Sequence, residues 1–365
     1  MTPHATLRIE KAAIEANTRT LVGSTQAEVM AVVKADGFGH GLAALSALEA
    51  GATRLGVTSI EEALPLRWMG VEAPILSWLN PLDADATAAI RNRIELAVPS
   101  IGHLGRYAAA ASRCGGVARI HLHVDTGMAR DGAAADEWRP LCDLAREYEA
   151  RGLVEVVGIM SHLARADEPG HPLTVRQRLL FDAAVRTAVR RGLRPRVRHL
   201  AATAATLTDA STHFDLVRVG AGLYGIDPSG TTTLRGAMTL SSRVTTVREV
   251  RAATPVGYGS RYLTDRPTRL ALVPLGYADG VPRGLSDGAS AWVRGRRVPI
   301  AGAVSMDQLV IDVGELGVEA GEEVVLFGPG DDGEPTLHEW AGWAGTIEHE
   351  LVTRIGSRVH VEEAA

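Results

Sequence analysis

Side chains able to carry acid–base or nucleophilic chemistry follow short apolar runs of this sequence. Lys34 comes directly after the run Val29–Val33, and His162 comes shortly after the run Val154–Met160. A primary amine can form a Schiff base with a carbonyl compound, an imidazole can transfer protons, and a guanidinium binds anions. Further polar side chains beside or within apolar runs are Arg130, His199, Thr203 and Arg218.

Each of these residues also has a purely structural interpretation. A lysine after an apolar strand is most often a solvated strand end, and a single arginine such as Arg130 or Arg218 is more often a surface or salt-bridge residue. His162 and His199 each fit a hydrogen-bonded structural histidine. Their recurrence at equivalent positions favours a common site. The residues alone predict a barrel enzyme that acts on an anion, with Lys34 as a candidate for Schiff-base formation.

Eight apolar runs alternate with longer amphipathic stretches between about residues 29 and 225. This alternation is typical of βα units repeated around a parallel sheet. It predicts a (β/α)8 barrel, in which functional side chains lie at the C-terminal ends of the strands. The predicted strands are Val29–Val33, Leu55–Ser59, Pro74–Trp78, Ile94–Pro99, Ala118–Val124, Val154–Met160, Arg196–Leu200 and Leu216–Val219.

The pattern changes after about Thr232 to β-branched runs with frequent Gly and Pro. Such runs favour strands over helices. We therefore expect two domains, with residues 1–232 forming the barrel and residues 233–365 forming a mainly β domain. The predicted β segments are Arg243–Val250, Leu270–Leu275, Ser290–Val298, Leu309–Val313 and Glu323–Phe327.

The composition restricts the class of partner. Of the 365 residues, 46% are hydrophobic and 22% are charged, and the formal net charge is −5. These fractions are ordinary for a globular protein with a sizeable core. Nucleic acids and anionic membranes favour a basic protein face, so the charge argues against both of these partners. We expect a small-molecule substrate.

The cysteines and the N-terminal residues indicate the compartment. Cys114 and Cys142 lie in helical segments without CxxC or metal-ligand spacing, so we expect reduced thiols and no metal. The first residues lack a signal-peptide pattern, and no run approaches about 18 apolar residues. These features predict a cytoplasmic protein.

Eight motifs, in the same order along the chain, resemble the alanine racemase family. The segment around Lys34 is similar to the lysine signature of that family, and the resemblance extends over nearly the whole chain. The motifs are Ala31–Gly41, Val124–Arg130, Ser161–Glu168, Val217–Gly220, Val256–Tyr262, Leu275–Gly280, Val304–Asp307 and Thr346–Glu350.

The resemblance implies a pyridoxal-5′-phosphate (PLP) enzyme that interconverts L- and D-alanine with two bases and supplies D-alanine for cell-wall precursors. It implies a PLP-binding barrel, a β domain and a head-to-tail homodimer whose active sites are shared. Lys34 would hold PLP as an imine and then act as the base on one face of the substrate. Tyr258 of the partner subunit would be the base on the other face.

The resemblance also assigns the groups around these two bases. His162 would lie against the tyrosine with Arg218 behind it, and Arg130 would reach the phenolic oxygen and the substrate carboxylate. A free phenol has a pKa of ~10, so activity near neutrality needs about 4 kcal/mol of preferential phenolate stabilisation. Arg218 would face the pyridine nitrogen, and because a guanidinium keeps its proton, that nitrogen would stay unprotonated.

The remaining site residues follow from the same resemblance. The phosphate would be held by the Thr203 hydroxyl, by the N–H groups of Gly220 and Ala221, and by His349. Tyr277 and Met306 of the partner subunit would narrow the substrate entrance beside Arg130, which suits a substrate the size of alanine.

Four positions depart from the common pattern of the family. Phe38 and His349 stand where tyrosines usually bind the phosphate, and Ala202 stands where an asparagine is usual. His123 replaces a lysine that is often carbamylated and orients the substrate-binding arginine, so a chloride or a carboxylate would have to orient Arg130 instead.

These departures leave other activities open. A racemase of another small amino acid, serine first, is the nearest alternative. A PLP-dependent decarboxylase on the same type of barrel is disfavoured by Arg218, because that chemistry favours an acidic partner for the ring nitrogen. A PLP-binding homologue without catalytic activity is the third alternative.

Overall fold

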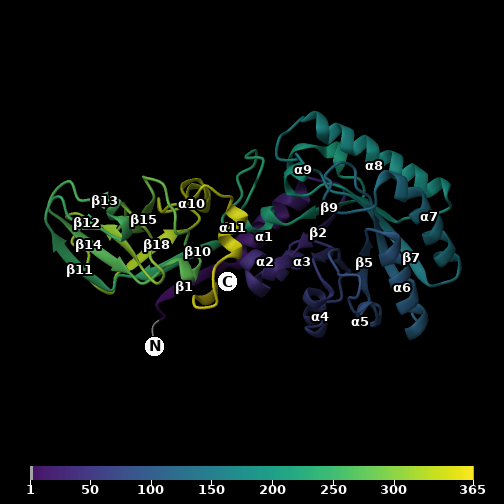
Figure 1. Cartoon of the computed structure of the whole chain (residues 1–365), viewed down its shortest axis with the longest axis horizontal. Coiled ribbons are helices and arrows are strands. Elements are labelled where there is room, and N and C mark those ends of the chain that lie inside the picture. The colour runs from purple at the N-terminus through teal and green to yellow at the C-terminus, as the bar shows by residue number, and fades with distance from the viewer. Residues whose placement is uncertain (1–2, 365) are drawn as a thin grey trace.

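The computed structural model describes residues 3–364 and has two parts (Figure 1). An α/β barrel occupies one end of the long axis, and a domain built mainly of strands occupies the other. No helix among the described residues is both long enough and apolar enough to cross a bilayer.

Eight parallel strands form the nearly closed barrel, which confirms the predicted fold class. The sheet order is β8-β7-β6-β5-β4-β3-β2-β9. Two backbone hydrogen bonds, from Asp215 N to Arg198 O (3.1 Å) and from Arg218 N to Ala201 O (3.0 Å), join the edge strands β8 and β9. The strands are β2 (Glu28–Val32), β3 (Arg54–Val57), β4 (Ile75–Ser77), β5 (Ile94–Val98), β6 (Ala118–His123), β7 (Val154–Met160), β8 (Val197–His199) and β9 (Leu216–Val219).

Helices surround this sheet, and several begin at side-chain caps that the sequence supplies. The side chains of Ser59, Asp85 and Ser100 accept hydrogen bonds from N–H groups in the first turns of α4, α5 and α6. The helical elements are α1 (Lys11–Gly23), α2 (Lys34–Gly39), η1 (Gly41–Leu45), α3 (Ser46–Glu49), α4 (Ile60–Trp68), α5 (Ala86–Arg91), α6 (Ile101–Cys114), α7 (Ala135–Ala150), α8 (Pro172–Arg190), α9 (Thr203–Thr208), η2 (Ala210–Thr212) and η3 (Ala221–Tyr224).

The second domain contains a six-stranded sheet, a three-stranded sheet and a two-stranded hairpin. Its strands are β10 (Met238–Arg243), β11 (Thr246–Val250), β12 (Pro255–Val256), β13 (Tyr262–Leu263), β14 (Thr268–Val273), β15 (Ser290–Val293), β16 (Arg296–Pro299), β17 (Leu309–Asp312), β18 (Glu323–Phe327) and β19 (His360–Ala364). Its helical elements are η4 (Tyr258–Ser260), η5 (Tyr277–Asp279), α10 (Leu337–Ala344) and α11 (Glu348–Thr353).

The chain crosses between the two parts near its N-terminus. The first strand, β1 (Ala5–Glu10), pairs antiparallel with β10 and parallel with β19. Residues 5–10 therefore lie in the sheet of the second domain, although the sequence pattern groups them with the barrel. Ala5, Leu7 and Ile9 alternate with more exposed residues, so one face of β1 is buried against that domain.

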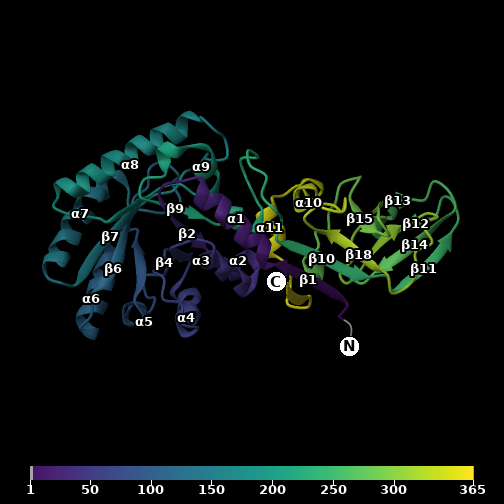
Figure 2. The same ribbon diagram turned by 180° about the vertical axis from the view of Figure 1, so that it is seen from behind.

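Helix α11 brings the second domain to the barrel mouth, where it lies beside α2 in both views (Figure 1 and Figure 2). The contact is close, because a Cβ atom at Gly39 would lie 2.3 Å from the carbonyl oxygen of Val352. This position requires glycine for a second reason, since its φ is +77°.

Candidate active site

Lys34 lies at the C-terminal end of β2, where the backbone enters a left-handed turn. The φ angles of Ala35, Asp36, Gly37 and Phe38 are 51°, 53°, 60° and 55°. Left-handed conformation costs an L-residue about 1–2 kcal/mol, so contacts with the rest of the barrel must stabilise this turn. One such contact is the hydrogen bond from Gly37 N to Val33 O, at 2.9 Å.

Glu62, on the neighbouring helix α4, holds the start of the turn. Its Oε1 accepts a hydrogen bond from Ala35 N at 2.8 Å, and its Oε2 accepts bonds from Thr58 N and Thr58 Oγ1, both at 2.7 Å. Burial alone would raise the pKa of Glu62, but these hydrogen bonds outweigh it and the pKa is lowered. The Ser59-x-x-Glu62 pattern signals a helix start, yet nothing in the sequence reveals the bond to Ala35.

The environment of Lys34 makes its ammonium group easier to deprotonate. Burial and the charge of Arg130 lower the pKa of Lys34, against the opposing effect of Glu62. The Nζ atom lies 5.8 Å from the centroid of the Phe38 ring. A neutral amine can attack a carbonyl carbon or accept a proton, so this lysine is suited to either role.

Arg218, on β9, joins two of the predicted histidines. Its Nη1 lies 3.1 Å from His199 Nδ1, and its Nη2 lies 3.2 Å from His162 Nδ1. The same guanidinium donates to the carbonyl oxygens of Ser161 (2.7 Å) and Leu200 (3.0 Å). Because a guanidinium only donates, Nδ1 of each imidazole is the acceptor and any ring proton is on Nε2.

Burial and neighbouring cations shift the pKa of these groups. Burial and then the charges of Arg218 and Arg130 lower the pKa of His162 to about 3. Burial and the charge of Arg130 lower the pKa of Arg218 to about 10. At neutral pH His162 is therefore a neutral donor through Nε2, while Arg218 remains a cation.

The loop after β6 presents Arg130 to this group. Asp125 accepts hydrogen bonds from the N–H groups of Gly127, Met128 and Ala129 and so fixes the loop. The charge of Arg130 is one of the causes that lower the pKa of Lys34, of His162 and of Arg218.

His123 ends β6 and has a carboxylate beside it. Its Nδ1 lies 3.4 Å from Asp131 Oδ2, and the residue is 7% exposed. Asp131 directly follows Arg130 in the sequence. Of the two alternatives, a chloride or a carboxylate, a carboxylate is therefore available to orient this loop.

Thr203 is the first residue of α9 and contacts the turn after β9. Its Oγ1 accepts hydrogen bonds from Gly220 N and Gly222 N, both at 3.2 Å. The N–H of Gly220 is thus already committed, while the Thr203 hydroxyl proton stays free to donate to an anion. Ala202 is the N-cap of α9 and provides no side-chain cap.

His349, on α11, reaches the same region from the second domain. Its ring centroid lies 6.0 Å from that of Phe38. Its Nδ1 is buried and has no hydrogen-bond partner among residues 3–364. Burial lowers the pKa of His349, assisted by the charge of Lys34 and opposed by that of Glu348.

Tyr258, Tyr277 and Met306 lie on the second domain, with exposed fractions of 71%, 36% and 54%. Their loops are neighbours, since Gly257 lies against the backbone of Ala303 and Ala278 N donates to Met306 O at 2.9 Å. Tyr258 stands between β12 and β13, at the end of the domain far from the barrel (Figure 1). A single chain does not bring it to Lys34.

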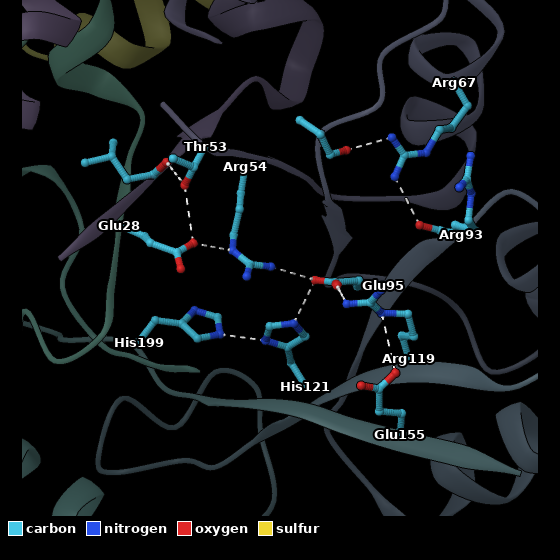
Figure 3. A network of polar contacts seen from close by, with 12 residues as sticks. Glu28, Thr53, Arg54, Arg67, Arg93, Glu95, Arg119, His121, Glu155 and His199 are labelled. Atoms are coloured by element: carbon cyan, nitrogen blue, oxygen red, sulfur yellow. Dashed lines mark hydrogen bonds and ion pairs between the residues drawn. The ribbon is translucent and has the colours of Figure 1, made fainter. Parts of the chain in front are cut away.

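A buried polar chain extends behind Arg218, and sequence reasoning missed most of it. His199 contacts His121, and His121 contacts Glu95 (Figure 3). Glu95 and His121 lie inside apolar strand runs, where the sequence alone does not distinguish them from residues on a solvated face. Among the described residues, no group of three or more His, Cys, Asp or Glu side chains could hold a metal ion.

A barrel of parallel strands with polar groups at the C-terminal ends of those strands is the architecture of an α/β-barrel enzyme. Two family descriptions match the chain: "Alanine racemase, N-terminal domain" over residues 9–228 and "Alanine racemase, C-terminal domain" over residues 237–362. The chain therefore belongs to the alanine racemase family.

Individual relatives agree with this assignment. An alanine racemase of Frankia casuarinae is 49% identical over 341 residues, which cover 91% of this chain and 89% of that protein. An alanine racemase of Thermobifida fusca is 47% identical and covers 98% of both chains.

Solved structures are similar over the full length. The alanine racemase of a D-cycloserine-producing Streptomyces lavendulae superposes with a TM-score of 0.97 at 41% identity, over 100% of this chain and 98% of that chain. The alanine racemase of Bartonella henselae, described with covalently bound pyridoxal phosphate, gives a TM-score of 0.88 at 29% identity over both whole chains.

The family depends on PLP, and the residues of this chain fit that cofactor. Lys34 provides an amine of lowered pKa, and the Thr203 hydroxyl provides a free donor. The orphaned Nδ1 of His349 is a third matching feature, because a protonated ring nitrogen there could donate to a phosphate oxygen.

Proposed function

We propose that this protein racemises alanine, with PLP held by Lys34 at the barrel mouth and with active sites shared in a homodimer. The observation that carries the proposal is the grouping of a lysine of lowered pKa with the buried cation Arg218 and the neutral His162. Family membership supports alanine as the substrate.

Bound PLP supplies the electron sink that makes the α-proton of an amino acid acidic. Lys34 would hold the cofactor covalently and then move a proton at its Nζ atom on one face of the substrate. Arg218 is the group proposed to meet the ring nitrogen. Because its pKa stays near 10, it would not give its proton to that nitrogen at neutral pH, which limits the electron sink and disfavours side reactions.

Tyr258 of the partner subunit is the proposed base on the opposite face. His162 accepts from Arg218 at Nδ1, so its Nε2–H is available to donate to the phenolic oxygen. Arg130, the second cation at the mouth, would bind the substrate carboxylate and further favour the phenolate. Both contacts lower the pKa of a phenol, as base catalysis near neutrality requires.

The exposure of the second-domain loops supports a homodimer. Tyr258, Tyr277 and Met306 form a partly exposed surface of the second domain. If it covers the barrel mouth of a second copy, Tyr277 and Met306 would narrow the entrance to substrates about the size of alanine. The proposal also places the enzyme in the cytoplasm, which the two unpaired thiols Cys114 and Cys142 support.

The phosphate of PLP would be held by the hydroxyl of Thr203, by His349 and by the turn that contains Gly220 and Ala221. In the described structure Gly220 N donates to Thr203 Oγ1, so this turn would have to exchange that bond or use Ala221 N. A network of backbone and hydroxyl donors at the end of a barrel strand is a common phosphate site.

The direct test is chiral chromatography of each of a panel of L-amino acids after incubation with the protein and PLP. D-alanine is the expected product. Faster formation of D-serine would reassign the substrate, and carbon dioxide with an amine would identify a decarboxylase. Borohydride reduction followed by peptide mapping should place the cofactor on Lys34, and a label on another lysine would contradict that assignment.

A further inference from the structure

Arg218 is a buried cation whose hydrogen-bond partners are all neutral. It is 5% exposed, and it pairs with no carboxylate in the part of the chain that the structure describes. Burying a charge without a counter-charge costs free energy. Something beyond its direct contacts must offset that cost and fix the orientation of the guanidinium.

The hydrogen bonds continue from Arg218 to a carboxylate across the barrel interior. His199 Nε2 lies 2.8 Å from His121 Nδ1, and His121 Nε2 lies 3.0 Å from Glu95 Oε2 (Figure 3). Glu95 is 1% exposed and both histidines are 0% exposed. This chain of hydrogen bonds connects residues on β9, β8, β6 and β5.

The two ends of this chain fix the direction of every bond in it. Arg218 can only donate, so His199 Nδ1 accepts and Nε2 carries the proton. His199 then donates to His121 Nδ1, and His121 donates through Nε2 to Glu95. A carboxylate accepts, so the far end requires the same direction.

A second proton on either imidazole would break this chain of hydrogen bonds. A proton on His121 Nδ1 would face the Nε2–H of His199, and a proton on His199 Nδ1 would face the guanidinium N–H. Both pairs would be donor against donor. Burial and then the charge of Arg218 also lower the pKa of His199 well below its ordinary value. The hydrogen-bond directions themselves require both rings to be neutral, each with its proton on Nε2.

The backbone makes room for the central ring. The pairing of β6 with β7 shifts register between Ile120 and His121. Opposite the ring is Gly158, where a Cβ atom would lie 2.4 Å from His121 Nδ1. Any other residue at this position would displace the imidazole from the chain.

Two arginines hold Glu95 in place. Arg119 Nη2 lies 2.8 Å from Oε1, and Arg54 Nη1 lies 3.4 Å from Oε2. Burial would raise the pKa of Glu95, but the His121 hydrogen bond and the charges of Arg119 and Arg54 outweigh it, and the pKa is lowered. The carboxylate is therefore ionised at neutral pH.

We propose that Glu95 is a positioning residue for Arg218. Through His121 and His199, its carboxylate sets the hydrogen-bond direction and the orientation of the guanidinium, which in turn presents Nη2 to His162 and leaves the His162 Nε2–H for the active site. The effect on catalysis rests on the proposed function of Arg218, whereas the chain of hydrogen bonds from Arg218 to Glu95 does not.

Three variants separate this role from a general loss of charge. Glu95→Gln keeps an acceptor of the same shape and removes the charge. Gly158→Ala keeps every charge and moves only the ring of His121. Glu155→Gln is the matched control, because Glu155 contacts Arg119 (3.8 Å) and Arg196 (2.6 Å) in the same region but touches no imidazole.

The readout independent of activity is NMR of the holoenzyme with 15N-labelled histidine. Between pH 6 and 8, His121 and His199 should both be neutral with the proton on Nε2. In Glu95→Gln the His121 Nε2–H proton should move upfield, because a bond to an amide is weaker than one to a carboxylate. The kcat for alanine should fall about tenfold with KM changed less than about twofold, since the loss acts on the reacting state.

Gly158→Ala should perturb the His199 Nε2–H resonance and lower kcat at least as much, and Glu155→Gln should do neither. A proton on Nδ1 of His199 in the unaltered protein would overturn the proposal, as would a Glu95→Gln enzyme indistinguishable from Glu155→Gln in both measurements. If the protein turned over no amino acid, the proposed function would fail. The histidine spectra would still decide whether the chain of hydrogen bonds from Arg218 to Glu95 exists.

Discussion

Arg218 donates from Nη2 to Nδ1 of His162 across 3.2 Å, so a buried cation holds an imidazole at the barrel mouth in its neutral form. The pKa of His162 falls to about 3 through burial and then through the charge of Arg218. Because its pKa is lower in the folded protein than the ordinary 6.5, this group stabilises the fold fully above pH 6.5. That contribution is lost as the pH falls toward 3.

We predict that replacing this histidine reduces the dependence of stability on pH. Between pH 6.5 and 4 the free energy of unfolding should change by about 1.4 kcal/mol less per pH unit in His162→Asn, which is the effect of one proton. Urea unfolding at several pH values measures the slope. Equal slopes in the variant and the unaltered protein would mean that His162 titrates normally when folded.

A second prediction concerns the turn that carries Lys34. Glu62 accepts three hydrogen bonds with two oxygens, so Glu62→Gln must turn its amide NH2 toward a donor. The variant should lose about 1–3 kcal/mol of stability and should bind PLP more slowly at Lys34. Glu61→Gln, at the exposed neighbouring position, is the control. Equal stability of the two variants would show that Glu62 does not hold the turn.

A third prediction concerns the cofactor phosphate. Cζ of Phe38, the atom that a tyrosine hydroxyl would extend, lies 3.0 Å from a Cβ built at Gly220. Phe38→Tyr would therefore direct a donor to the proposed phosphate turn and should raise PLP affinity by up to about tenfold, or ~1.4 kcal/mol. His349→Tyr should raise PLP affinity as well, because the phenol would supply an O–H donor where His349 Nδ1 has no hydrogen-bond partner among residues 3–364. Unchanged affinity in both variants, measured by titration of apo-protein, would mean that other groups hold the phosphate.

The fold followed from the sequence because apolar periodicity records burial directly. Runs such as Val154–Met160 are buried on both faces, and the structure has a strand with the same bounds. Strand β1 was not predicted, and its residues were assigned to the barrel, because a short alternation such as Ala5, Leu7 and Ile9 does not show which strands would pair with it.

The residues of the site also fall into those that the sequence predicts and those that it does not. Lys34, His162 and Arg218 were predictable because each stands at or near a strand end, and the structure groups them. Glu62 and Glu95 were not predictable as site residues. Glu62 looks like a helix-cap residue, and Glu95 looks like part of a β-strand run. Their roles depend on contacts between neighbouring strands and turns, which a single sequence does not display.

The two proposed bases should be distinguishable by isotope exchange. In Tyr258→Phe one face of the substrate would lose its base while Lys34 still serves the other. Deuterium from D2O should then enter one alanine enantiomer much faster than the other, as followed by mass spectrometry after chiral separation. Similar slowing for both enantiomers would contradict the assignment of one base to each face.

A shared active site is needed to bring the two proposed bases together, because Tyr258 is 71% exposed and stands between β12 and β13, at the end of the molecule opposite the barrel. Lys34→Ala and Tyr258→Phe chains should each be nearly inactive alone. After mixing and subunit exchange, about half the dimers should be heterodimers with one intact site, giving about a quarter of full racemase activity. A mixture that exchanges subunits, as native mass spectrometry would show, and yet stays as inactive as its separate components would contradict a shared active site.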